Sequence, residues 1–110
     1  GKPTTVAIAT MARIAVADPY AGRTAVPTLT RHLTRRTADG ELLAEALATV
    51  LTRYPAERRT VLSVLSTADG AGRLRAARRL TATGDHVAKA VAEAALDGSP
   101  LSRFLPDSRR

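Results

Sequence analysis

Apolar residues recur at helical spacing along almost the whole chain, and this periodicity limits the fold more than any other feature. No stretch shows the strict alternation of branched and aromatic residues that a half-buried strand needs. In residues 40–53, Leu43, Leu47, Val50 and Leu51 lie three or four positions apart and form one apolar stripe. The sequence therefore predicts an all-α protein.

Turn-forming residues divide this pattern into about six short helices. Asp-Pro, Asp-Gly, Tyr-Pro and Gly-Asp pairs separate the apolar runs, and each favours a turn or a helix end. Pro27 falls in the first turn of its helix, where the missing N–H is harmless. The first helix is apolar on so many sides that we expect it to be nearly surrounded. The predicted helices are 4–17, 25–36, 40–53, 56–67, 71–82 and 85–96.

The chain length of 110 residues allows one domain, 1–110, with one modest core. Because it begins with Gly1 rather than Met, we expect a piece of a larger protein. The apolar run 6–17 is interrupted by Arg13 and is too short to cross a bilayer, so no membrane segment is predicted. A further short turn is expected between Pro100 and Pro106. Cysteine is absent, so the redox compartment cannot be read and cytoplasmic is only the default.

One tetrapeptide occurs twice. Thr-Ala-Asp-Gly stands at 37–40 and again at 67–70, and a further Asp-Gly pair stands at 97–98, which gives a period of about 29 residues. Each Asp-Gly pair is predicted to lie between two helices, with Pro55 and Gly84 marking the intervening turns. The chain is therefore interpreted as an array of antiparallel helical hairpins.

Two segments of this array resemble HEAT-type repeats. Residues 25–33 (AVPTLTRHL) are similar to a HEAT first helix with its early proline, and residues 39–48 (DGELLAEALA) to the turn and alanine-rich second helix. The resemblance covers about residues 21–96 and implies a right-handed solenoid that serves as a binding scaffold. The sequence departs from the family in having Asp-Gly for the usual Asp-Pro turn and few bulky side chains in 71–82. A compact six-helix bundle is the alternative.

Arginines form two clusters that are the candidate binding residues. The chain has 17 Lys and Arg against 10 Asp and Glu, a net charge of +7 that favours acidic partners. Arg75 and Arg79 are one turn apart on a face predicted to be exposed, where they can hold carboxylates or phosphates or simply be solvated. In a solenoid the two helices that carry these clusters are expected to line different faces, so the clusters are expected to lie apart. They form one surface only if those faces align. The clusters are Arg73, Arg75, Arg78 and Arg79 on one helix, and Arg31, Arg35 and Arg36 on another.

Residues that would support catalysis or cofactor binding are scarce. His32 and His86 stand far apart without a metal-binding motif, and the serines lie in no nucleophile elbow. Glu41 and Glu45 are one turn apart but are interpreted as an exposed, solubilising pair near a helix N-terminus. We therefore predict no enzyme activity, no metal, no cofactor and no small-molecule substrate.

The leading interpretation is a non-catalytic scaffold module that binds an acidic partner protein, or the rest of a larger parent protein, through its arginine-bearing faces. Charge varies along the chain: residues 1–38 carry +5, residues 39–72 carry −2 and residues 73–110 carry +4. A continuous nucleic-acid track would be basic throughout. The acidic middle therefore slightly favours a protein partner.

The alternative is a DNA-binding domain that contacts phosphates with the same arginines or places helix 26–36 in a groove. Residues 26–40 (VPTLTRHLTRRTADG) also resemble the recognition helix of winged-helix DNA-binding regulators, with residues 11–16 as the preceding helix. This resemblance implies that Thr28, Thr30, Arg31 and Arg35 face the major groove. Against it, residues 41–67 are predicted to be helical where that family has strands.

Overall fold

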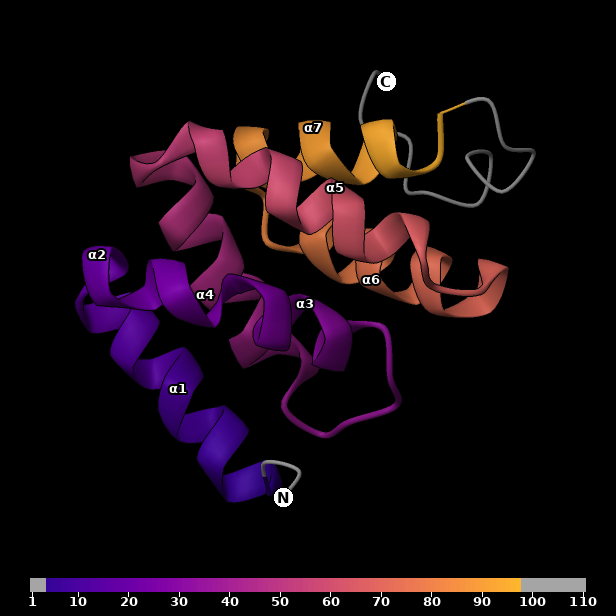
Figure 1. Ribbon diagram of the computed structural model, residues 1–110. Helices are drawn as coiled ribbons and strands as arrows, with labels where there is room; N and C mark the ends of the chain where they lie inside the picture. The colour runs from indigo at the N-terminus through magenta and orange to yellow at the C-terminus, as the bar shows by residue number, and fades with distance from the viewer. Residues whose placement is uncertain (1–3, 98–110) are drawn as a thin grey trace.

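Figure 1 shows the computed structural model, which describes residues 4–97 as helices joined by short turns. The described residues contain no strand, so the all-α prediction is confirmed. None of the helices among them combines the length and apolar composition needed to span a bilayer. The turn expected between Pro100 and Pro106 lies outside the described residues. The elements are α1 (Thr5–Ala17), α2 (Pro19–Gly22), the 3-10 turn η1 (Arg23–Ala25), α3 (Val26–Leu33), α4 (Gly40–Arg53), the 3-10 turn η2 (Pro55–Glu57), α5 (Arg58–Ser66), α6 (Gly70–Ala82) and α7 (His86–Ala95).

The helix boundaries mostly follow the turn signals. The prediction for α4 is confirmed at both ends, and those for α1, α6 and α7 are within one residue at each end. Two short elements, α2 and η1, were not predicted, and the helix predicted over 56–67 is divided into η2 and α5. Pro19 starts α2, and Asp18 Oδ1 accepts a hydrogen bond from the N–H of Ala21 (3.3 Å). The helix predicted over 25–36 ends early, at Leu33, for a reason given below.

Helix α4 lies at the centre of the molecule and packs against α1, α2, α3, α6 and α7. It is buried on nearly every side because its residues are aliphatic or small, and alanine lets neighbouring helices approach closely. Helices α3 and α7 both pack against α5 as well, so helices distant in sequence are in contact. In an open solenoid each unit contacts only its neighbours. The arrangement is consistent with the small helical bundle. The buried α4 residues are Gly40, Leu43, Ala44, Ala46, Leu47, Ala48, Val50 and Leu51.

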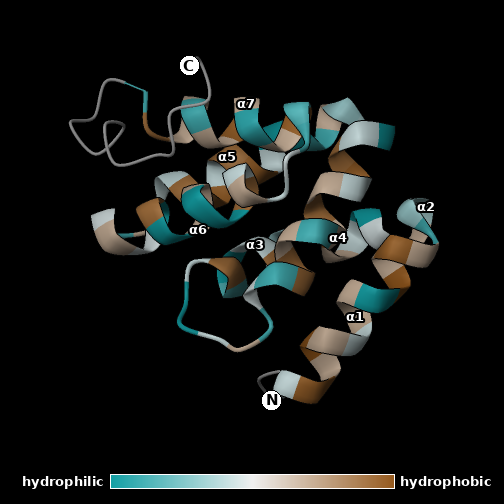
Figure 2. Ribbon diagram, turned by 180° about the vertical axis from the view of Figure 1, so that it is seen from behind, coloured by the Kyte–Doolittle hydropathy of each residue, from teal (hydrophilic) through white to brown (hydrophobic). Residues whose placement is uncertain are grey.

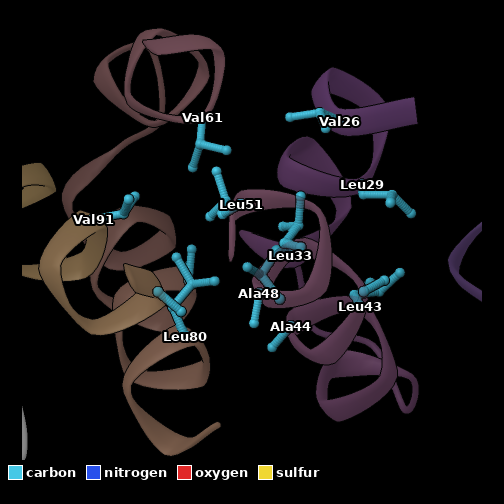
Figure 3. Close-up of a cluster of buried hydrophobic side chains, with 14 of the residues drawn as sticks. Val26, Leu29, Leu33, Leu43, Ala44, Ala48, Leu51, Val61, Leu80 and Val91 are labelled. Carbon is cyan, nitrogen blue, oxygen red and sulfur yellow. The ribbon is translucent and has the colours of Figure 1, made fainter. Parts of the chain in front are cut away.

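The core forms where α3, α5, α6 and α7 meet α4 (Figure 3). Leu29 and Leu33 of α3 face Leu43 of α4, while Leu80 of α6 and Val91 of α7 approach from the other side. All five side chains are almost completely removed from solvent. Each is worth about 1.5–3 kcal/mol of transfer free energy relative to full exposure, so this cluster is the main source of stability.

Helix α1 is an outer helix, which corrects the expectation that it would be nearly surrounded. It packs against α4, α2 and α3, and its other side is open (Figures 1 and 2). Val6 is 75% exposed and Ile14 is 51% exposed. At its C-terminal end α1 is close to α2, where a Cβ on Gly22 would lie 2.6 Å from the Cβ of Ala15. Glycine is therefore required at this crossing.

The repeated tetrapeptide starts a helix both times. α4 begins at Gly40 and α6 at Gly70, the equivalent residues of the two copies. Asp69 has extended backbone, and its Oδ1 accepts from the N–H of Gly72 at 2.7 Å, so it caps α6. Asp39 has ψ of 15° and makes no such bond to α4. The same four residues thus begin two helices with different capping.

Candidate interaction surface

Arg79 of α6 binds the C-terminal end of α3. Its Nη1 donates to the backbone oxygens of Leu33 (2.8 Å) and Arg35 (2.6 Å), and its Nη2 donates to that of Thr37 (3.4 Å). Carbonyls at a helix C-terminus lack partners within the helix, and they form the negative end of its dipole. A planar guanidinium therefore suits this position well. Because the Leu33 carbonyl accepts from Arg79 instead of from a later N–H of its own helix, α3 ends here.

Arg75 supports the same contact one turn earlier on α6. Its Nη1 donates to the backbone oxygen of Thr34 at 2.5 Å. Both Arg75 and Arg79 are half-buried, so the expectation that they stand on an exposed face is wrong. Burial and, to a smaller extent, the neighbouring Arg75 charge lower the pKa of Arg79. These two arginines position the backbone that connects α3 to α4.

The second arginine cluster lies on this same connection. Arg31 is in the last turn of α3, Arg35 and Arg36 follow it, and all three are exposed. His32 beside them is half-buried. Burial, followed by the charges of Arg35 and Arg31, lowers the pKa of His32 below its ordinary value. Arg75 and Arg79 of the first cluster therefore meet the second cluster at residues 33–37.

The remaining two arginines of α6 differ from each other. Arg78 is exposed and lines a hollow of about 380 Å³ together with Thr37 and Ala38 of the α3–α4 connection. Arg73 points to the α5–α6 turn instead: its Nη2 donates to the backbone oxygen of Ala68 (3.1 Å), and its Nε is buried. Arg73 is thus separate from the others. We name the exposed group the basic surface; it consists of Arg31, Arg35, Arg36 and Arg78.

A groove between α4 and α6 begins beside the basic surface. Its two hollows measure about 380 and 450 Å³ and adjoin each other, since Glu41, Arg79 and Ala82 line both. Glu41 and Glu45 of α4 line one side and Arg78 and Arg79 of α6 line the other, with the buried Ala44 between them. We name this feature the α4/α6 groove. Sequence reasoning missed it, because the spacing of each charged pair was visible but the pairing of α4 with α6 was not.

A second cluster that sequence reasoning missed joins α2 and η1 to the end of α4. The Arg23 guanidinium carbon lies 5.2 Å from the ring centroid of Tyr20 and 5.0 Å from that of Tyr54. The two rings meet edge to face with centroids 6.1 Å apart. Arg23 Nε also lies 3.4 Å from a carboxylate oxygen of Glu57. Because these contacts join η1 to α2, to the end of α4 and to η2, we assign the cluster a structural role.

The geometry of α3 bears on the expectation that residues of this helix face the major groove of DNA. Thr30 is fully buried, and its hydroxyl donates to the backbone oxygen of Val26 at 2.7 Å. It therefore cannot face a DNA groove, and that expectation is wrong for this residue. Thr28 is half-buried and accepts from Arg31 Nη2 at 3.4 Å. Of the four residues expected to face the major groove, Arg31 in α3 and Arg35 just after it are exposed.

Neither a metal-binding cluster nor a known relative adds to this picture. Within residues 4–97 no three His, Cys, Asp or Glu side chains are placed to hold a metal ion. His32 and His86 lie on different helices, α3 and α7. No protein-family model, no curated protein and no solved structure matches the chain. The functional argument therefore depends on the basic surface and the α4/α6 groove.

Proposed function

We propose that this domain is a non-catalytic interaction module that binds an acidic partner protein through the basic surface. The observation that carries the proposal is the meeting of the two arginine clusters at the α3–α4 connection. Arg31, Arg35, Arg36 and Arg78 are exposed residues there. Guanidinium groups form paired, charge-assisted hydrogen bonds with carboxylates.

The anchoring of the connection by α6 strengthens this argument. Arg79 fixes the carbonyls of Leu33 and Arg35, and Arg75 fixes that of Thr34. The exposed arginines therefore extend from backbone that is already ordered. Preorganised backbone lowers the entropic cost of binding, and this makes a short loop more effective as a recognition element.

DNA binding is the second candidate, because the same surface attracts phosphates. The observation that favours it is the exposure of Arg31 in the last turn of α3 and of Arg35 and Arg36 shortly after this helix. The carboxylates of Glu41 and Glu45 border the adjoining groove and repel a polyanionic backbone. A protein surface can place acidic groups at discrete points and avoid these carboxylates, whereas a DNA backbone cannot.

Binding of two labelled probes, a polyglutamate peptide and a random duplex DNA, tests the proposal over about 50 to 200 mM salt. The test variant is Arg35→Glu/Arg36→Glu, which reverses two exposed charges of the basic surface. The matched control is Arg13→Glu/Arg59→Glu, which reverses two exposed charges on α1 and α5. Both variants have the same net charge, so a difference between them reports position.

We expect the Arg35→Glu/Arg36→Glu variant to bind polyglutamate at least about tenfold more weakly than the control, since each charge-assisted bond is worth about 1.5 kcal/mol or more. Equal loss in both variants contradicts a localised surface. Tighter binding of DNA than of polyglutamate, with a steep salt dependence, replaces the proposal by the nucleic-acid reading. If neither probe binds at the lowest salt, both candidate functions are overturned.

A further inference from the structure

The outer face of α1 is apolar and exposed. Val6 is 75% exposed and Ile14 is 51% exposed, and Figure 2 shows hydrophobic residues along most of this helix. Thr10 on the same face turns its hydroxyl back and donates to the backbone oxygen of Val6 at 2.9 Å. Arg13 is the only charged residue of α1. A helix that is apolar on nearly every side is normally covered on nearly every side, so this face is suited to contact with another protein surface.

The exposed residues of this face have the spacing of a coiled-coil seam. Seam positions alternate at intervals of three and four residues, and two helices with such stripes pack side by side. On α1 four exposed residues follow this spacing, and they are Ala7, Thr10, Ile14 and Ala17. We name them the α1 seam. Ile14 is its only large residue, so a second helix can approach closely while Ile14 fills the contact.

Opposite charges flank the C-terminal half of the α1 seam. At 3.6 residues per turn, Arg13 is rotated about 100° from Ile14 to one side, and Asp18 about 40° to the other side. The N–H of Asp18 donates to the carbonyl of Ile14 at 2.7 Å, so Asp18 continues the helical path. Both charged residues are exposed, and neither forms an ion pair within the part of the chain that the structure describes. The last turn of α1 also has no basic residue to balance the negative end of the helix dipole.

We propose that the α1 seam binds the same seam of a second copy of this chain, with the two α1 helices parallel and related by a two-fold axis that runs along them. A half-turn about this axis exchanges the flanks of the two helices without changing height. Arg13 of each copy therefore faces the flank of the other copy that carries Asp18. The two residues differ by about 7.5 Å in height, which an extended arginine side chain spans. Because the interface is isologous, this charge contact forms twice.

Charge complementarity selects this occupant and this direction. In an antiparallel pair the two-fold axis crosses the helices, and each flank faces the same flank of the second copy. Arg13 then faces the flank that carries Arg13, and no opposite charges meet. A strongly acidic partner is attracted by Arg13 but is repelled by Asp18 and by the negative end of the helix. A face with one positive and one negative flank is therefore complementary to itself in the parallel arrangement.

This pairing goes beyond the proposed function and is independent of it. The seam lies on α1, whereas the basic surface consists of residues of α3, the connection that follows it, and α6. Helix α1 has 13 residues and is about 20 Å long. A contact between two such helices is smaller than a standard protein interface, so we expect weak pairing with a Kd on the order of 0.1 mM. Polyglutamate binding is measured well below this concentration, so either proposal can fail without the other.

Disulfide trapping tests the pairing and its direction, because the chain has no cysteine of its own. In a parallel pair every seam position faces itself, so Ala7→Cys and Ala17→Cys each bring two thiols together. In an antiparallel pair the two ends of the seam face each other instead. The control is Ala90→Cys, at an exposed position on α7. We expect both seam variants to form disulfide-linked dimers at least about tenfold faster than the control under mild oxidation. Fast trapping at only one seam position, or at neither, overturns the proposal.

Charge reversal provides a second test, measured by sedimentation equilibrium at up to about 1 mM protein. Arg13→Glu alone and Asp18→Lys alone each place like charges in both contacts, and we expect each variant to be monomeric. An equimolar mixture of the two variants places opposite charges in both contacts and should dimerise like the wild-type chain. The controls are Arg59→Glu on α5 and Glu93→Lys on α7, two exposed charge reversals that should leave dimerisation unchanged.

Two outcomes of the sedimentation experiment overturn the proposal. One is a wild-type chain that stays monomeric at the highest concentration, and the other is a mixture that is no more dimeric than its separate components. Circular dichroism checks the fold of Asp18→Lys, because Asp18 also caps α2 through the N–H of Ala21. The cysteine variants keep Asp18, so they test the pairing whether or not Asp18→Lys folds.

Discussion

Replacing Gly40 by alanine tests whether Arg79 holds the α3–α4 connection. A Cβ at Gly40 would lie 2.5 Å from Nε and 2.7 Å from Cζ of Arg79, so the guanidinium must move. A free arginine would move at little cost. This one donates to the carbonyls of Leu33 and Arg35, and moving it breaks these bonds.

The magnitude follows from those bonds and from the preference of helices for alanine. Hydrogen bonds from a charged group contribute about 1.5–3 kcal/mol when buried, and Arg79 is only half-buried, so about 1 kcal/mol for each of two bonds is reasonable. Gly→Ala returns up to about 1 kcal/mol in a helix interior and less at the first residue, where Gly40 stands. We expect Gly40→Ala to lower the free energy of unfolding by about 1–2 kcal/mol. In an Arg79→Met background the same change should be neutral or slightly stabilising.

Urea denaturation followed by circular dichroism measures the cost of Gly40→Ala in the wild-type protein and in the Arg79→Met background. The two costs together complete a double-mutant cycle. Gly70→Ala is the control, since Gly70 opens the second copy of the tetrapeptide and lies nine residues before Arg79 on α6, about 13 Å away. Its effect should be the same in both backgrounds. An equal cost of Gly40→Ala with and without Arg79 would refute the anchoring role of this arginine.

Three further predictions concern capping, pH and close packing. Asp69→Ala should lower the free energy of unfolding by about 1 kcal/mol, and Asp39→Ala by less than about 0.5 kcal/mol, because the Asp69 side chain caps its helix and that of Asp39 does not; equal losses in urea denaturation contradict this assignment. The lowered pKa of His32 means that the unfolded chain binds its proton more readily, so stability is full above pH 6.5 and falls as the pH drops below it. His32→Gln should flatten this pH dependence of stability between about pH 7.5 and 5.5. If the free energy of unfolding of the variant still falls in this range, groups other than His32 cause the fall. Gly22→Ala forces a Cβ against the Cα of Ala15 at 2.8 Å and should cost about 2 kcal/mol, a fall of roughly 8 °C or more in the melting temperature; an unchanged melting temperature contradicts the close crossing.

Local pattern was enough to place the long helices, because their start and stop signals lie within the helices or next to them. Helix α4 is the clearest case: Asp39 and Gly40 begin it and Pro55 follows its end. Helix α2 was missed because four residues are too few to show a period, and Asp18 was read only as a turn. The burial of α1 was predicted wrongly because periodicity reports which side is apolar but not whether a neighbour covers it, as Ile14 shows.

The candidate site was only partly predictable for the same reason. Sequence placed Arg79 on the correct helix, but its partner Leu33 lies 46 positions away. No spacing rule connects residues so far apart, and only the packing of α6 against α3 brings them together. The spacing of Glu41 and Glu45 was visible, yet their role as one wall of a groove depends on the neighbouring α6.

The cluster of Tyr20, Arg23 and Tyr54 gives the molecule a built-in optical reporter. The chain has two tyrosines and no tryptophan, and both tyrosines belong to this cluster. The tyrosine signals of the folded protein in the near ultraviolet therefore originate at a single junction, where α2 and η1 meet the end of α4. Comparing those signals with far-ultraviolet circular dichroism distinguishes local opening of that junction from loss of the whole bundle, with no label added.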